Sequence, residues 1–430
     1  MDYEDALDAM GVGGYQKLLM VVCGLANATD AIEILSLSYV IPEIETEIAA
    51  WSLGALSSAV FAGMLIGALV GGFLSDVIGR RPVLMCSMLL NAIFTALFAL
   101  AAGEYVMVVL RFFTGFGVGA SVPVVFAYPA EVVPSANRGM AITVVALSWM
   151  IGSIVVAGLA WAIIPSYGWR LFAFACSLPA LACSICLMTV IKESPRFLLV
   201  KGKTNEASKA VSHICRFNSA SFGSNETQVV RIKALSLDHG NEKLWFRVRQ
   251  LWQHRLRTRS FLLALVWIGI CFGWYGLATW IPTMLKEKNV ALCWGEASTR
   301  SCLYQTAVLV ALSNLPGNIL SLLLVDVIGR NTLLSVSMFL SALSAIGAWL
   351  SKDGVATGIF FCIFNGVSVV GWNILDILST EMFPTALRGV AMGLLSSLGR
   401  ISAAVRSLSV LSCRSHSPAG CSAAVQHGVF

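Results

Sequence analysis

Two acidic residues stand three positions apart inside a run that is otherwise apolar. Asp30 and Glu33 lie within residues 16–38, and side chains at this spacing share one face of a helix. In hydrocarbon a carboxylate costs about 2.5–3.5 kcal/mol even on the lenient insertion scale. Arg111, near the start of another apolar run, is the candidate partner. Burial favours the neutral carboxyl group and a guanidinium favours the ionised one, so these residues could form a proton switch. A permanent ion-pair strut is the structural alternative.

Histidine takes no part in this chemistry. The five histidines, which all lie outside the apolar runs, are His213, His239, His254, His416 and His427. A proton carrier inside the membrane must therefore be a carboxylate. A membrane-embedded enzyme would need a nucleophile with a base or a metal cluster at that depth, and the sequence disfavours it. We expect no enzymatic activity, no metal and no cofactor.

Aromatic and polar residues also occur together in two apolar runs of the second half of the chain. They are Trp274, Tyr275, Trp280, Asn365, Trp372, Asn373 and Asp376. Cavities for small organic solutes combine aromatic walls with a few hydrogen-bonding groups, so these are candidate solute contacts. Each could instead serve packing or an interfacial aromatic belt. Asp376 is the strongest candidate, because a lone acid in a span suggests function.

The elements that must position these residues are membrane-spanning helices. Of the 430 residues 57% are hydrophobic and 12% are charged, and the mean hydropathy is +0.80. Runs of about 20 apolar residues are long enough to cross a bilayer as helices. The runs are 16–38, 52–74, 82–102, 106–128, 140–164, 169–191, 260–285, 304–325, 332–350, 354–378 and 390–405. We therefore predict an all-α, polytopic membrane protein with about eleven spans, the last of them weak.

Basic residues predict the orientation of these spans. Residues 192–259 hold fourteen Lys and Arg against five Asp and Glu, and such loops stay on the cytoplasmic side. No nucleic-acid-binding signature accompanies them, so we expect no nucleic-acid partner. The acidic first fifteen residues do not resemble a cleavable signal, and we expect them in the cytoplasm. Cys293 and Cys302 fall in an outward loop, where a disulfide is one of two open alternatives.

An internal repeat divides the chain into two halves. The segment 76–80 recurs as 326–330 with the same residues, and Glu131 with Arg138 recurs as Glu381 with Arg388, each at an offset of 250. Two motifs at one offset indicate that a whole multi-helix unit was duplicated. The expected divisions are 1–15 (amino-terminal segment), 16–191 (first six-helix lobe), 192–259 (cytoplasmic linker), 260–405 (second lobe, incomplete) and 406–430 (polar tail).

The repeated turns carry both acids and bases. Their residues are Gly72, Asp76, Gly79, Arg80, Arg81, Glu131 and Arg138 in the first half, and Asp326, Gly329, Arg330, Glu381 and Arg388 in the second. Glycine permits a tight turn between helices, and the charges could form an ion-pair cluster that latches the lobes in one state. The alternative is topological anchoring by the basic residues alone.

These turns resemble those of the major facilitator superfamily. Residues 72–81 are similar to its signature between spans two and three, with Val77 in place of the usual basic residue. Glu131-x-x-Pro134 with Arg138, and residues 193–198, resemble sugar porters and metabolite:proton symporters. Residues 4–13 and 30–33 resemble proteins related to synaptic vesicle 2 and to nicotinate transporters. The resemblance implies two pseudo-symmetric six-helix bundles, and it places proton coupling at an acid of span one and an Arg of span four, here Asp30 or Glu33 and Arg111.

The combined prediction is a secondary transporter for a small polar organic solute such as a sugar, an organic acid or an organic cation. We expect proton coupling, alternating access and a monomer in the lipid bilayer of the plasma membrane or of an intracellular vesicle. Residues 406–430 lack an apolar run, and we interpret them as a truncated or aberrantly spliced carboxyl end that has lost most of span eleven and all of span twelve. A genuine short cytosolic or luminal tail is the other interpretation of this segment. For the function of the whole chain a second hypothesis is also kept. The alternative is a non-transporting sensor or an inactive splice product with the same fold.

Overall fold

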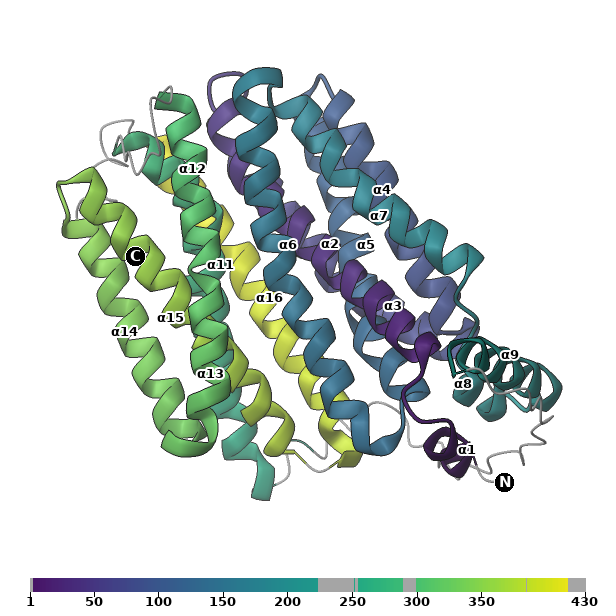
Figure 1. Ribbon diagram of the computed structural model, residues 1–430. Coiled ribbons are helices and arrows are strands. Elements are labelled where there is room, and N and C mark those ends of the chain that lie inside the picture. Colours follow the sequence, from purple (N-terminus) through teal and green to yellow (C-terminus); the bar gives the residue numbers. More distant parts are fainter. Residues whose placement is uncertain (1–2, 223–250, 252–253, 289–298, 384, 417–430) are drawn as a thin grey trace.

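The computed structural model describes residues 3–222, 251, 254–288, 299–383 and 385–416, and within them every regular element is a helix (Figure 1). The helices are α1 (Tyr3–Met10), α2 (Gly14–Ile44), α3 (Ala50–Ile78), α4 (Arg80–Leu100), α5 (Glu104–Val132), the 3-10 turn η1 (Ser135–Asn137), α6 (Arg138–Tyr167), α7 (Trp169–Thr189), α8 (Pro195–Val200), α9 (Thr204–Phe222), α11 (His254–Glu287), α12 (Thr299–Leu312), α13 (Asn314–Ile328), α14 (Arg330–Leu350), α15 (Gly354–Glu381) and α16 (Thr385–His416). The all-α prediction is confirmed.

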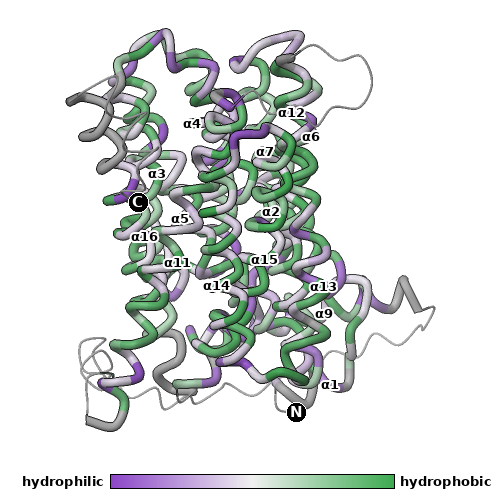
Figure 2. Tube along the Cα trace, turned by 90° about the vertical axis from the view of Figure 1, so that its left-hand side faces the viewer, coloured by the Kyte–Doolittle hydropathy of each residue, from purple (hydrophilic) through white to green (hydrophobic). Residues whose placement is uncertain are grey.

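Ten stretches of the described chain are long and apolar enough to span a bilayer. They coincide with ten of the eleven predicted runs, and α12 with α13 makes one of them. The eleventh run, 390–405, lies in α16, which continues to His416 into the segment expected to be a polar tail. Figure 2 shows hydrophobic residues along most of the length of the helices. Large apolar side chains such as Phe73 and Val327 face outward, as a lipid-facing surface requires.

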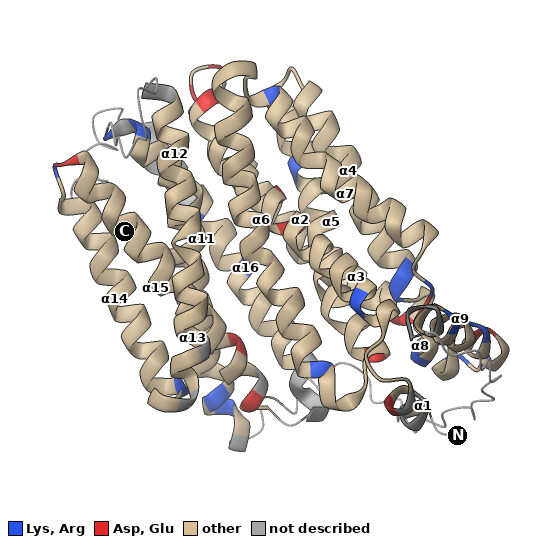
Figure 3. Ribbon diagram, in the orientation of Figure 1, with Lys and Arg blue, Asp and Glu red and all other residues tan. Residues whose placement is uncertain are grey.

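Figure 1 shows the long helices of the two halves of the chain side by side as two lobes. Lobe 1 contains α2 to α7, and lobe 2 contains α11 to α16. The short helices α8 and α9 and the helix α1 lie at one end of lobe 1, here called the linker end, and the opposite end is called the far end. Figure 3 shows charged residues gathered toward the two ends of the helices, with few between.

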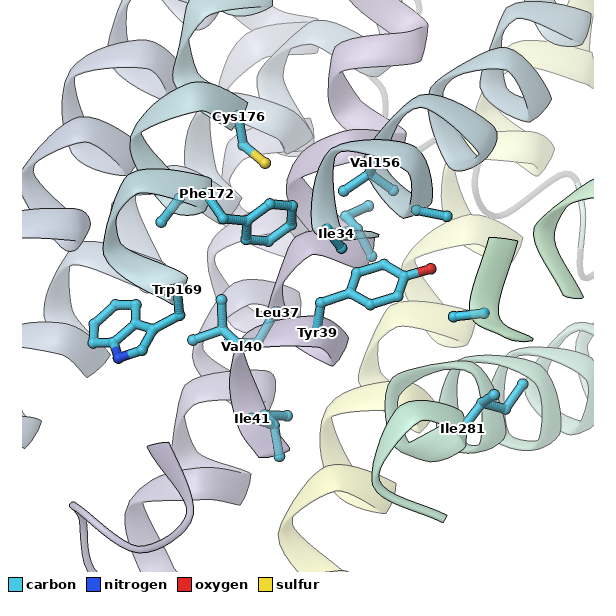
Figure 4. Close-up of a cluster of buried hydrophobic side chains, with 14 of the residues drawn as sticks. Ile34, Leu37, Tyr39, Val40, Ile41, Val156, Trp169, Phe172, Cys176 and Ile281 are labelled. Carbon is cyan, nitrogen blue, oxygen red and sulfur yellow. The ribbon is translucent and has the colours of Figure 1, made fainter. Parts of the chain in front are cut away.

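Apolar packing joins the lobes in one half of the molecule only. The core of the far half takes residues from both lobes, among them Tyr39 and Phe172 of lobe 1 and Ile281 of lobe 2 (Figure 4). Tyr304 of lobe 2 belongs to the same core. The core nearer the linker end is split, because one cluster contains residues of lobe 1 and the linker, and another contains residues of α11, α13, α14, α15 and α16 with Leu251. The lobes are therefore in apolar contact at the far half and separate at the linker half.

Polar contacts at the far end reinforce this joint. Lys286 Nζ donates to the carbonyl oxygen of Pro42 at 2.6 Å, and Tyr304 Oη donates to Glu43 Oε1 at 2.8 Å. Cys302 is disulfide-bonded, and Cys293, its expected partner, lies outside the described residues.

The linker end of lobe 1 is covered by a small helical cap. Tyr3 and Leu7 of α1 are fully buried against α8 and α9. Tyr3 Oη donates to the carbonyl oxygen of Glu131 at 2.7 Å, and the amide of Tyr15 donates to Asn218 Oδ1 at 3.0 Å. The cap is therefore attached to lobe 1.

Glycines let α3 and α5 approach closely. Gly63 and Gly67 of α3 face the backbone of Phe112 and Phe116, and Gly119 of α5 faces the backbone of Met64. A Cβ at any of these positions would overlap a backbone carbonyl oxygen. The Gly-rich string of residues 115–119 is therefore a packing surface of the kind found between membrane helices.

We expect Gly67→Ala to lower the free energy of unfolding by about 1–3 kcal/mol, because the added methyl group must push two backbones apart. Thermal melting of the purified protein in detergent measures the effect. The matched control is Gly158→Ala in α6, where nothing lies within 4 Å of the added carbon. Equal stability of the two variants would contradict the close packing.

Candidate functional site

The two acids of α2 are buried in lobe 1. Asp30 and Glu33 are 0% and 1% exposed. Asp30 Oδ2 accepts a hydrogen bond from Ser121 Oγ of α5 at 2.5 Å, and Glu33 Oε2 accepts one from Thr95 Oγ1 of α4 at 2.8 Å. The second oxygen of each carboxyl group has no partner among the described residues. Each acid thus has only part of the hydrogen bonding that a buried carboxylate requires.

Arg111 of α5 pairs with one of these acids. It is fully buried, its Nη1 lies 3.7 Å from Glu33 Oε2, and its guanidinium carbon lies 3.9 Å from the centre of the Phe98 ring. Nη1 is also 3.5 Å from Ser36 Oγ. The structure therefore brings Arg111 to Glu33, while Asp30 contacts Ser121 instead.

Arg400 of α16 is a further charged residue near this site, which sequence analysis did not identify. It is 8% exposed, and its charge interacts electrostatically with Asp30 across the boundary between the lobes. The sequence contained a feature that could have identified Arg400, because an Arg within an apolar run is as rare as an Asp. The weak hydropathy of residues 390–405 concealed it.

Three of the predicted solute contacts form one aromatic cluster in lobe 2. The ring of Trp274 lies 4.9 Å from that of Tyr275 and 5.9 Å from that of Trp372, and Tyr275 and Trp372 are also 5.9 Å apart. Trp267, which was not predicted, lies 5.8 Å from Trp372. Phe61 of lobe 1 packs 5.0 Å from Tyr275, so the cluster reaches the lobe boundary.

The two predicted amides are engaged inside lobe 2. Asn365 Nδ2 donates to the carbonyl oxygen of Val310 at 2.7 Å. Asn373 Nδ2 donates to Asn318 Oδ1 at 3.0 Å and to Ser321 Oγ at 2.8 Å. Both amides thereby tie α15 to its neighbours α12 and α13. Trp280 is buried in the far-half core.

Asp376 lies near the aromatic cluster. It follows Trp372 by four residues on α15, so the two side chains share one face of the helix. Its side chain is exposed, and its charge interacts with Tyr275 and Cys271 of α11. Asp376 is thus an exposed acid beside a half-buried cluster, where a solute can reach it.

The predicted charge cluster at the linker end of lobe 1 is present. Arg80 Nε donates to Glu131 Oε1 at 3.0 Å and Arg80 Nη1 to Asp76 Oδ1 at 2.7 Å. Gly79, with a φ of +117°, makes the turn that lets α3 end and α4 begin. Gly72 lies one turn before Asp76 and accepts from Ser75 Oγ through its carbonyl oxygen.

Glu193, which follows α7, contacts this charge cluster through its carboxylate. Its carboxylate accepts from the backbone amides of Arg80 and Arg81, which are the first residues of α4, and so caps that helix. Burial raises the pKa of Glu193. The Arg81 side chain donates to the carbonyl oxygens of Leu187 and Met188 at the end of α7. Sequence analysis identified Glu193 only as part of a motif, because its partners lie more than a hundred residues away.

Lobe 2 repeats the arrangement more loosely. Arg330 Nη2 lies 3.2 Å from Glu381 Oε1, and both side chains are partly exposed. Gly329 has a φ of +87°, matching Gly79. The side chains of Asp326 and Arg388 lie outside the described residues, and Arg138 begins α6. The ion pairs described at this end join helices within one lobe.

A comparison with known protein families identifies the family to which this architecture belongs. The family model of the Major Facilitator Superfamily matches residues 21–405. The chain belongs to this superfamily. It is therefore a multi-pass membrane protein with a transporter fold.

Similar curated proteins include mouse synaptic vesicle glycoprotein 2C, which is 26% identical over 94% of this chain and 76% of its own length. Human synaptic vesicle glycoprotein 2B is 26% identical over 93% of this chain and 80% of its own length. Among solved structures, the partially occluded inward open xylose transporter XylE from E. coli has a TM-score of 0.73 at 17% identity, covering 96% of this chain and 94% of that one. These likenesses support the superfamily fold and a relation to the synaptic vesicle 2 proteins.

We expect Glu193→Ala to lower the free energy of unfolding by about 1–3 kcal/mol, because two amides at the start of α4 lose a charged acceptor. The matched control is Asp76→Ala, which removes an acid whose side chain is 72% exposed, and should cost about 0–1 kcal/mol. Thermal melting of both variants measures the difference. A larger loss for Asp76→Ala than for Glu193→Ala would contradict the capping role.

Proposed function

We propose that this protein is a proton-coupled secondary transporter that carries a small polar organic solute by alternating access. The observation that carries the proposal is the burial of Asp30 with an incomplete set of hydrogen bonds, within electrostatic reach of Arg400 in the other lobe. A carboxylate in this position costs free energy unless it is paired or protonated. Gain and loss of a proton at Asp30 therefore change the energy of bringing the two lobes together.

The groups that face Asp30 come from four helices. Glu33 lies on α2, Ser121 on α5, Cys183 on α7 and Arg400 on α16. The ionised acid attracts Arg400, and the protonated acid does not. A ligand shifts a two-state equilibrium only if its affinity differs between the two states. The electrostatic interaction between Asp30 and Arg400 would make the affinity of Asp30 for a proton differ between the two arrangements of the lobes, so protonation would shift their equilibrium.

Glu33 and Arg111 support the same switch from within lobe 1. Their pair is buried, so removing either charge leaves the other without compensation. We assign this pair to tuning the electrostatic field around Asp30. If these buried charges formed only a permanent structural ion pair, replacing Asp30 would leave proton coupling unchanged.

The solute is proposed to bind between the lobes, beside the aromatic cluster of Trp274, Tyr275 and Trp372. Flat aromatic surfaces and a few polar groups suit small organic solutes. The split core at the linker half and the shared core at the far half support a rocking motion in which the joint moves from one half to the other. A solved D-xylose-proton symporter with a TM-score of 0.69 to this chain shows that such a fold can couple solute and proton in another protein.

The test is uptake into liposomes containing the purified full chain, with radiolabelled D-xylose, benzoate and choline as probes of the three solute classes. We expect at least one probe to enter faster under an inward proton gradient than at equal pH, after subtraction of protein-free liposomes. Asp30→Asn should abolish the effect of the gradient, because the neutral amide cannot exchange a proton.

Glu47→Gln is the matched control, since it removes an exposed acid of the same lobe that belongs to none of the charge clusters described, and it should keep the gradient effect. Uptake that responds equally to the gradient in the wild-type protein and in Asp30→Asn would overturn the proposed coupling. Absence of uptake for all three probes would favour a sensor with the same fold.

A further inference from the structure

Ser121 of α5 lies between the carboxyl group of Asp30 and a backbone carbonyl group. The serine is fully buried, and its Oγ lies 2.5 Å from Asp30 Oδ2 and 2.6 Å from the carbonyl oxygen of Val118. A hydroxyl group carries one hydrogen atom, although its oxygen can accept further hydrogen bonds. Ser121 therefore cannot donate fully to both oxygens, and one of the two contacts needs a hydrogen atom from another group.

A protonated Asp30 supplies that hydrogen atom. Its O–H donates to Ser121 Oγ, while the Ser121 hydroxyl donates to the carbonyl oxygen of Val118, and both distances lie in the normal range for O–H···O bonds. Another buried serine of the same lobe directs its hydrogen atom in this way, because Ser177 Oγ donates to the carbonyl oxygen of Phe174 at 2.6 Å. The short pair of contacts at Ser121 thus fits a neutral Asp30.

The surroundings of Asp30 favour the same protonation state. Its Oδ1 is enclosed and has no hydrogen-bond partner among the described residues. An unpaired oxygen costs less in a neutral carboxyl group than in a charged one. The charged and titratable groups near Asp30 are Glu33 on α2, Cys183 on α7 and Arg400 on α16. Within the described part of the chain, Arg400 does not form an ion pair with Asp30.

The neighbouring acid, Glu33, is held differently. Its partner Thr95 has one short contact, because Oγ1 lies 2.8 Å from Glu33 Oε2 and 3.4 Å from Asn91 Oδ1. Thr95 can therefore donate to Glu33 without giving up a second short bond. Arg111 Nη1 lies 3.7 Å from the same Glu33 oxygen. A donor and a cation together suit an ionised carboxylate, so the hydrogen bonds distinguish Glu33 from Asp30.

We infer that Ser121 is a positioning residue for the coupling proton, and that its hydroxyl reverses direction when Asp30 changes protonation state. This inference rests on the proposed function and adds a residue to it. When the Oδ2–H bond of Asp30 breaks and the proton passes to water, the Ser121 O–H turns from Val118 to the carboxylate. When water returns a proton to Asp30, the O–H turns back. Ser121 keeps its own hydrogen atom, so Asp30 has a hydrogen-bond partner in both states.

The test is infrared difference spectroscopy of the purified full chain in lipid vesicles, comparing mildly acidic with mildly alkaline pH. The C=O stretch of protonated Asp30 is identified as the band that Asp30→Asn removes. In Ser121→Ala we expect this band to move to higher frequency, because the neutral acid loses its hydrogen-bond acceptor. Ser121→Cys should shift the band less and in the same direction, since a thiol is a weaker partner. The second variant keeps the test decisive if the first does not fold.

Ser177→Ala is the matched control, because it removes a buried hydroxyl group of the same lobe that donates to its own helix and contacts no acid in the described residues. It should leave the Asp30 band unchanged. A general loss of stability does not move this band, whereas loss of the bond to Asp30 does. Three results would each overturn the inference: no band removed by Asp30→Asn, an unchanged band in the Ser121 variants, or an equal shift in Ser177→Ala.

These outcomes are separable from the proposed function. Gradient-driven uptake that depends on Asp30, with a band that does not respond to Ser121→Ala, would keep the proton-coupled transporter and refute only the role of Ser121. A band that shifts in Ser121→Ala, without gradient-driven uptake of any probe, would keep Ser121 as the partner of protonated Asp30 and refute the transport.

Discussion

The burial of ionisable groups in apolar helices is the constraint on which the rest of the structure depends. Asp30, Glu33 and Arg111 are buried in lobe 1. Each has a polar side-chain atom without a hydrogen-bond partner among the described residues, so a permanent charge at these positions is energetically unfavourable. A fold without a use for them would gain stability by replacing them with apolar side chains. In the proposed mechanism, the position of Asp30 within electrostatic reach of Arg400 of lobe 2 makes the energy of the lobe boundary depend on protonation.

That dependence matters because the lobes are not joined uniformly. Residues of both lobes share the core of the far half, whereas the two cores of the linker half are separate. The charged turns at the linker end hold each lobe together internally, through Arg80 and Glu193 in lobe 1 and through Arg330 and Glu381 in lobe 2. In the proposed mechanism each lobe moves as a rigid body, and the charges between the lobes decide which half closes.

Sequence analysis predicted the fold well because its signals are local or repeated. Apolar runs set the spans, and an offset of 250 residues between identical turns indicated two lobes. The site was harder to predict, because contacts between spans depend on helix rotation and packing. The rings of Trp274 and Trp372 pack edge to face, but Asn365 and Asn373 join helices of lobe 2. Arg400 was missed because the weak hydropathy of residues 390–405 concealed it, and the capping role of Glu193 was missed because its partners are distant in sequence.

The most direct test of a protonation-controlled lobe boundary is a distance measurement across the linker end. Spin labels at Ser135 of lobe 1 and Thr332 of lobe 2, both exposed, report the separation of the lobes by double electron–electron resonance. In the wild-type protein we predict two distance populations whose ratio changes between mildly acidic and mildly alkaline pH. In Asp30→Asn with Glu33→Gln we predict one ratio at all pH values. An equal pH response in both proteins, or none in the wild type, would contradict the account.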